Sequence, residues 1–181
     1  MNDSSPVTGM PLTDATVNLF KGGTLQTTFT LTEQFAFGSH YSWRLKESEI
    51  RFRGSGEFAQ LVIRRIPASD AQVEEFFAAV EFLQVREWRS DYHPGDINQE
   101  VLDGSSWSFT ASVHGLECCC GGENAYPSFA DPEFTTTGRG RFGLLHAAMY
   151  DCFEIESYIR QARLLAEATK QRSVDTQDRP N

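Results

Sequence analysis

Apolar and polar residues alternate through much of the first half of the chain, with the period of half-buried β-strands. The expected inward positions are Leu25, Thr27, Phe29 and Leu31 in residues 24–31, then Tyr41, Trp43 and Leu45, then Ile50 and Phe52. A more continuous apolar run over residues 57–66 predicts a fourth, buried strand. Because short connections separate these segments, the pattern predicts three or four antiparallel strands.

The periodicity then becomes helical. Ser69 and Gln72 have the spacing of a capping box, in which each residue bonds the other's backbone N–H at the start of a helix. The apolar positions that follow form one helical stripe: Val73, Phe76, Phe77, Val80 and Leu83. We therefore expect a helix over residues 70–83 with this stripe against a core.

The next segments predict extended chain and a hairpin. Residues 85–92 are expected to be extended. Residues 107–113 alternate again, and residues 116–120 return after a turn at His114-Gly115, which predicts a hairpin that ends at Gly121-Gly122.

A second helical pattern begins at Phe142 and predicts either one long C-terminal helix or two. The order of strands, helix, strands and helix predicts an α+β fold. We expect a mainly antiparallel sheet of about six strands, one helix after the fourth strand and a C-terminal helix packed on one face. A single domain is expected over residues 15–168, between polar flexible tails at 1–14 and 169–181.

The chain is acidic. Asp and Glu total 25 against 16 Lys and Arg, a formal net charge of −9, and the sequence pI is ≈ 4.9. Phosphate contacts need clustered Lys and Arg, so the charge argues against a nucleic-acid partner and suits a basic protein. No window approaches the ~18 to 20 apolar residues of a membrane span. The polar start lacks the apolar segment of a secretory signal, so neither membrane contact nor secretion is expected.

Three of the four cysteines are adjacent, at 118–120, and the fourth is Cys152. This spacing does not resemble a disulfide framework and favours a reduced, cytoplasmic protein. Successive strand residues point to opposite faces, so at most Cys118 and Cys120 share a side, unlike the spaced pairs of zinc sites. We expect small buried residues here, with no metal and no cofactor. The alternative is a small thiol- or His/carboxylate-dependent enzyme that uses Cys120 or His93.

Two glycine-rich segments raise the possibility of anion binding. For residues 121–124 a turn that needs positive φ is the preferred interpretation. In Gly138-Arg139-Gly140-Arg141 the two arginines either hold an anion or belong to a mobile loop, and the sequence leaves both interpretations open.

Residues 88–127 carry a pattern of aromatic and turn residues. It runs through Trp88, Tyr92, Asp103-Gly104-Ser105-Ser106-Trp107 and Gly122-Glu123-Asn124-Ala125-Tyr126-Pro127. This pattern resembles a loosely defined group of small bacterial α+β domains that have no established activity. The resemblance implies a helix that ends near a Trp, a hairpin entered through Asp-Gly-x-x-Trp and a closing helix. It implies no function, and the cysteine run and the Thr/Gly segment after Pro127 depart from the pattern.

The middle of the chain concentrates negative charge. Residues 87–133 contain nine acidic residues and one basic residue, Arg89, with aromatic residues between them. Exposed acids speed encounter with a basic protein, and exposed aromatic rings anchor it. We expect a partner-binding surface that contains Trp88, Asp91, Tyr92, His93, Asp96, Glu100, Asp103, Glu123, Asn124 and Tyr126.

These expectations lead to a functional hypothesis. A small acidic domain without a catalytic motif suits a non-enzymatic bacterial binding protein, and most concretely an immunity protein that neutralises a basic antibacterial toxin. The loop at 91–103 and the turn at 121–127 would block the toxin's active site. Oligomeric state does not follow from the sequence.

Overall fold

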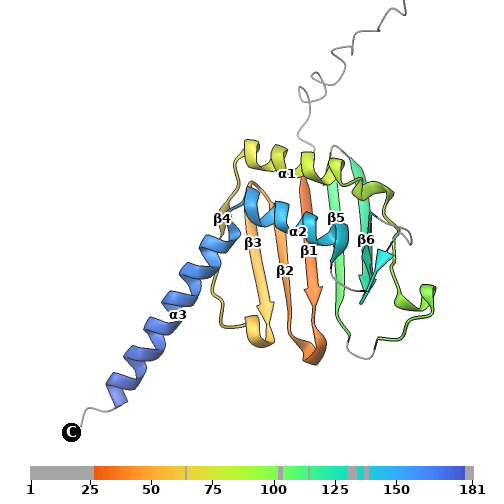
Figure 1. Cartoon of the computed structure of the whole chain (residues 1–181). Helices are drawn as coiled ribbons and strands as arrows, with labels where there is room; N and C mark the ends of the chain where they lie inside the picture. The colour runs from red at the N-terminus through yellow and green to blue at the C-terminus, as the bar shows by residue number, and fades with distance from the viewer. Residues whose placement is uncertain are drawn as a thin grey trace, which may run out of the picture.

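The computed structural model describes residues 27–63, 65–101, 104–113, 115–129, 134–136 and 139–177. A six-stranded antiparallel sheet has the order β4-β3-β2-β1-β5-β6, and helices α1 and α2 lie over one of its faces (Figure 1). The strands are β1 Thr28–Gln34, β2 His40–Lys46, β3 Glu49–Ser55, β4 Ile66–Pro67, β5 Ser106–Val113 and β6 Leu116–Glu123. The helices are α1 Asp70–Phe82, α2 Gly140–Cys152 and α3 Ile155–Gln177, and β7 Tyr126–Pro127 pairs with β8 Phe134–Thr135 in a small second sheet. The predicted α+β class and antiparallel sheet are confirmed.

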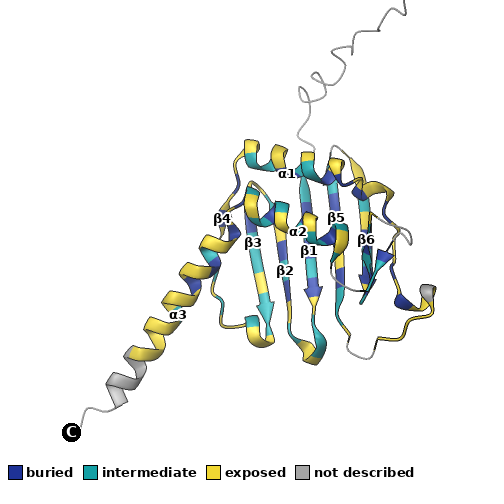
Figure 2. Cartoon of the chain, in the orientation of Figure 1, coloured by how far each residue is buried: buried dark blue, intermediate teal, exposed yellow. Residues whose placement is uncertain are grey.

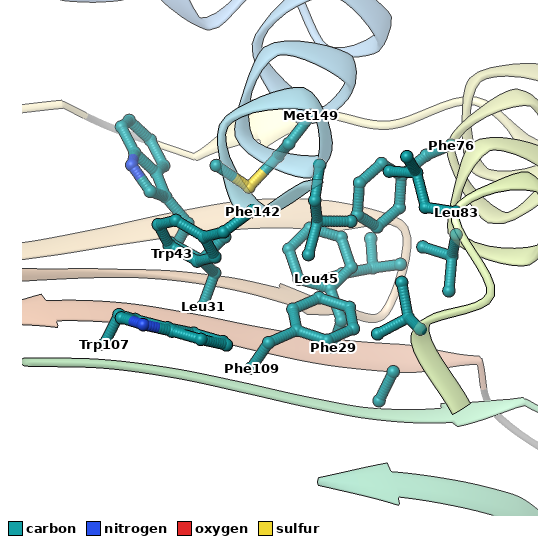
Figure 3. Packing of buried hydrophobic residues seen from close by; sticks show 14 of the residues in the cluster. Phe29, Leu31, Trp43, Leu45, Phe76, Leu83, Trp107, Phe109, Phe142 and Met149 are labelled. Atoms are coloured by element: carbon teal, nitrogen blue, oxygen red, sulfur yellow. The ribbon is translucent and has the colours of Figure 1, made fainter. Parts of the chain in front are cut away.

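The core lies between the sheet and the two helices. Alternate residues of β1, β2 and β5 point toward α1 and α2, as the sequence pattern predicts. Large side chains from both layers meet there and are almost fully buried: Phe29, Leu31, Trp43, Leu45, Phe76, Phe109, Phe142 and Met149 (Figure 3). The rings of Phe29 and Phe76 lie 4.7 Å apart between β1 and α1. Each such side chain contributes roughly 2 to 3 kcal/mol through burial alone.

Helix α1 begins as predicted. The Ser69 hydroxyl accepts a hydrogen bond from the backbone N–H of Gln72 at 3.3 Å, and the Gln72 side chain accepts one from the Ser69 N–H at 2.9 Å. Phe76, Val80 and Leu83 face the core, and the opposite side of the helix is exposed (Figure 2).

The expected strand over residues 57–66 is wrong except at its end. Gly56–Phe58 form a 3-10 turn, η3, and only β4 pairs with β3. Gly56 has φ +61, and a Cβ there would clash with the Ser39 hydroxyl oxygen. The chain therefore turns at Gly56, and the apolar Val62 that follows is 75% exposed.

Two further boundaries differ from the sequence expectation. The expected extended segment over residues 85–92 is wrong at its start, because Gln84 takes a left-handed conformation (φ 54) that leads into the 3-10 turn η4, Val85–Glu87. Trp88 is extended, and Tyr92 forms a β-bridge with Gly122. Strand β6 does not stop at Gly121-Gly122 but runs through them to Glu123.

The C-terminal pattern forms two helices. Glu154 has φ 52 and separates α2 from α3. Helix α3 extends away from the sheet (Figure 1) and continues to Gln177, past the expected domain boundary at residue 168. The expected N-terminal tail, Leu25 and residues 178–181 lie outside the described residues. Across the part of the chain that is described, none of the helices is both long enough and apolar enough to pass through a membrane.

Candidate functional site

The aromatic residues of the 88–127 pattern form a buried cluster around Trp107. Trp88, Tyr92 and Trp107 are 7%, 3% and 4% exposed. The Trp107 ring centroid lies 6.2 Å from that of Trp88, 6.1 Å from Tyr92 and 4.4 Å from Phe142 of α2. The expectation that Trp88 and Tyr92 are exposed anchors is therefore wrong. They belong to the core because their rings fill the space between the hairpin β5–β6 and the 88–101 segment.

Hydrogen bonds fix each indole of this cluster. Trp88 Nε1 donates to the Leu83 carbonyl at 3.0 Å, and Trp107 Nε1 donates to the Ala125 carbonyl at 2.8 Å. A buried Trp needs such a partner for its N–H. The two bonds hold the end of α1 and the turn after β6 in place.

Asn124 and Tyr126 support the same turn. Asn124 Oδ1 accepts a hydrogen bond from the Ser105 N–H at 2.8 Å, and Tyr126 Oη lies 3.0 Å from Ser105 Oγ. Asn124 has φ 49, a conformation that Asn tolerates better than most residues. These contacts give the turn residues of the pattern a structural role.

A backbone bridge attaches the 91–101 loop to the edge strand of the sheet. The Tyr92 N–H donates to the Gly121 carbonyl at 3.0 Å, and the Glu123 N–H donates to the Tyr92 carbonyl at 2.9 Å. A Cβ on Gly122 would lie 2.9 Å from Tyr92 Cβ and 2.6 Å from the Ala125 carbonyl oxygen. Gly122 is therefore the residue that lets the loop approach β6.

The bridge brings several predicted surface residues together. Asp91, His93 and Glu123 are exposed on either side of it, and His93 Nε2 lies 3.8 Å from Glu123 Oε2. We call the exposed carboxylates of this region, Asp91, Asp96, Glu100 and Glu123, the acidic rim. Arg89 Nη2 contacts Asp96 Oδ2 at 2.6 Å, so the guanidinium balances the charge of this carboxylate of the rim. Asp103 lies outside the described residues.

A second polar group was not predicted. Glu33 of β1 is 3% exposed and lies at the end of the core. Arg139, which immediately precedes α2, contacts both of its carboxylate oxygens, with Nη2–Oε2 at 2.7 Å and Nη1–Oε1 at 3.0 Å. The Tyr41 hydroxyl donates to Oε1 at 2.7 Å, and His146 Nε2 lies 3.3 Å from Oε1 and 3.1 Å from Tyr41 Oη.

Burial and charge tune the groups around Glu33. Burial, reinforced by Arg139, lowers the pKa of His146 to about 4, so this imidazole is neutral near pH 7. Burial, and then the charge of Glu33, raise the pKa of Tyr41. Burial works to lower the pKa of Arg139, but the charge of Glu33 raises it overall.

The Glu33 cluster is a closed network rather than an open site. Both carboxylate oxygens have partners, and the bidentate Arg139 pair joins β1 to the start of α2. The anion that Arg139 holds is thus the chain's own carboxylate. A signal was present in the sequence, since Glu33 takes the next inward position after Phe29 and Leu31 in an alternating strand.

The cysteine run follows strand alternation. Cys120 is 2% exposed and faces the core, Cys118 is half-buried on the same side, and Cys119 is exposed on the opposite side. Burial raises the pKa of both the Cys118 and Cys120 thiols. Within the described ranges, no three metal-binding side chains come together.

A cavity of about 310 Å³ lies between the end of α1, η4 and the hairpin β5–β6. We call it the hairpin cavity. Its lining residues are Phe77, Val80, Glu81, Gln84, Val85, Arg86, Glu87, Ala111, Val113, Leu116 and Cys118. Its apolar residues come from all three elements, and charged residues from the α1 end and η4 surround them.

Comparison with protein-family models, curated proteins and solved structures finds no match to this chain.

Proposed function

We propose that the protein is a non-enzymatic binding protein that captures a basic protein. In its most concrete form it is a cytoplasmic immunity protein that covers the active site of an antibacterial toxin. Support comes from the exposed carboxylates Asp91 and Glu123, which flank the bridge between Tyr92 and Gly122 at the edge of the sheet.

The acidic rim has the properties of a capture surface. Its carboxylates are solvent-exposed, and Asp91 and Glu123 make no ion pair with Lys or Arg among the described residues. Unpaired exposed charge raises the rate of encounter with a partner of opposite sign. The buried rings of Trp88, Tyr92 and Trp107 support the loop from below, so the rim is held in a fixed shape before binding.

A second candidate is a small His/carboxylate-dependent enzyme. The observation that favours it is the 3.3 Å contact between His146 Nε2 and Glu33 Oε1. The double contact of Arg139 with Glu33 opposes it, because both carboxylate oxygens are already bound by the guanidinium. The thiol version has less support, since Cys120 is buried and its pKa is raised.

The capture proposal is tested with proteins encoded beside this chain. Each is purified and titrated calorimetrically against the full-length protein at low and high salt. We expect one basic protein to bind stoichiometrically, with an affinity that falls as salt rises. It should be toxic when expressed alone and harmless when co-expressed. Absence of binding by every such protein would overturn the proposal.

A further inference from the structure

The outer backbone edge of strand β6 is hydrogen-bonded over only half of its length, although η4 packs beside the strand. The bonds from Tyr92 to Gly121 and Glu123 show that the odd-numbered residues of β6 direct their backbone groups outward. The backbone N–H and C=O groups of the even-numbered residues therefore point toward β5, with which β6 pairs in an antiparallel register that sets Cys120 opposite Phe109. Among the described residues, no backbone group bonds the outward N–H and C=O of Glu117 or Cys119.

The hairpin cavity lies beside this free half. Leu116, which is 56% exposed, and Cys118 line it from β6. A strand added next to β6 would place its inward side chains over the same face as Cys118, because side chains of paired strands share faces. One inward side chain of the added strand would therefore enter the cavity between Cys118 and Val85.

Charge around the free edge favours a basic ligand. Glu81 and Glu87 line the hairpin cavity together with Arg86, which already lies 3.8 Å from Glu81 Oε1. Glu117 lies on the opposite face of β6, where it lines a second hollow together with Arg44. An apolar floor with an acidic surround suits a segment in which apolar and basic side chains alternate. The chain itself uses this edge for backbone pairing, since Tyr92 forms an isolated bridge with its other half.

We propose that residues 116–120 of β6 dock an extended segment of the basic partner, which adds as a strand and places one apolar side chain in the hairpin cavity. The inference deepens the proposed function, on which it rests for the basic character of the partner. It specifies the mode of recognition, which is main-chain pairing at a sheet edge combined with one side-chain pocket.

The probe is the synthetic peptide acetyl-Lys-Val-Lys-Leu-Lys-Val-Lys-amide, titrated into the full-length protein. Saturable binding is expected, and the amide hydrogen exchange of Cys119 should slow by about tenfold at saturation. A peptide of the same charge, N-methylated so that it cannot pair as a strand, should have neither effect. Unchanged exchange at Cys119, or equal binding of the N-methylated peptide, would overturn the proposal.

A variant pair isolates the outward backbone N–H. Cys119→Pro removes that donor and leaves the ladder to β5 intact, because proline is tolerated where an edge N–H faces solvent. We expect Cys119→Pro to weaken peptide binding about fivefold to tenfold and Cys119→Ala to leave it unchanged. Equal affinities would contradict strand addition. If Cys119→Pro does not fold, the exchange measurement on the unmodified protein decides.

The same experiments separate this proposal from other occupants and from the capture function. Protection of Cys119 without peptide would show that the edge is already covered and would overturn the proposal. Protection that rises with protein concentration identifies a second copy, and protection at all concentrations identifies another part of the chain. If the basic partner binds Cys119→Pro as tightly as the unmodified protein, the proposal of docking at β6 is overturned, whereas the proposed capture function is supported. If the peptide binds as expected but no protein encoded beside this chain does, docking at β6 is supported and the proposed capture function is overturned.

Discussion

Glu33 and Arg139 lie 106 positions apart in the chain and meet through two contacts, at 2.7 and 3.0 Å. The Glu33 carboxylate is almost fully buried, and Arg139 is the residue that immediately precedes α2. This pair fixes where α2 begins over the sheet. Because Phe142 of α2 packs on Trp107 at 4.4 Å, it also supports the cluster beneath the acidic rim.

Removing the charge of Glu33 should destabilise the fold. Glu33→Gln leaves the half-buried Arg139 without its counter-ion, and we expect a loss of about 2 to 3 kcal/mol in the free energy of unfolding. Urea denaturation followed by circular dichroism measures it. The matched control Glu74→Gln, on the exposed side of α1, should cost less than about 0.5 kcal/mol. Equal costs for the two variants would refute a stabilising role for the Glu33 pair.

His146 predicts a pH dependence of stability. Its pKa is lowered from 6.5 to about 4 in the folded protein, so between these values the unfolded chain binds the proton first. The free energy of unfolding is therefore highest, as far as this residue is concerned, above pH 6.5. It falls by up to about 3 kcal/mol as the pH is lowered toward 4. Thermal unfolding from pH 7 to 4 tests this. His146→Phe should flatten the profile in that window, whereas His93→Asn, at an exposed position, should not.

Gly122 should not tolerate a side chain. In Gly122→Ala the new Cβ would lie 2.6 Å from the Ala125 carbonyl oxygen and 2.9 Å from Tyr92 Cβ, so the loop or the strand must shift. We expect a cost of about 1 to 3 kcal/mol, and faster hydrogen exchange at the amides of Tyr92 and Glu123. Gly104→Ala is the control, because nothing lies within 4 Å of its added Cβ. A Gly122→Ala protein as stable as the control would show that the approach of the loop to β6 does not require glycine at this position.

The cysteines should differ in reactivity. Cys119 is exposed, whereas Cys120 is buried and burial raises its pKa. Alkylation by iodoacetamide at pH 8, followed by peptide mass mapping, should modify Cys119 first and leave Cys120 unmodified in the folded protein. Cys119→Ser should remove the fast phase. Early modification of Cys120 would instead support the thiol-enzyme alternative.

The sequence was sufficient for the elements whose periodicity is local. Alternation located β2, β3, β5 and the first part of β6, and the Ser69–Gln72 spacing located the start of α1. It failed at residues 57–66, where apolar residues line an irregular segment, and at Gln84, whose left-handed conformation has no sequence signature. Local periodicity carries no information about such backbone turns.

The exposure of the predicted surface residues follows the sequence only in part. Asp91 and Glu123 are both exposed and flank the bridge at Tyr92, a long-range contact that no local pattern indicates. Trp88 was assigned to the surface because composition cannot distinguish a ring beside exposed acids from one beneath them. The Glu33 network was missed because its members come from distant parts of the chain.

Charge reversal on the acidic rim tests the capture function most directly. The measurement is the affinity of the basic partner, once identified by titration, for Asp91→Lys/Glu123→Lys and for the control Glu74→Lys/Glu167→Lys, whose acids are also exposed, on α1 and α3. Both variants change the net charge by the same amount. A loss of at least about tenfold, mainly in the association rate, is expected for the rim variant alone. Equal losses in the two variants, or no loss in either, would contradict capture by the rim.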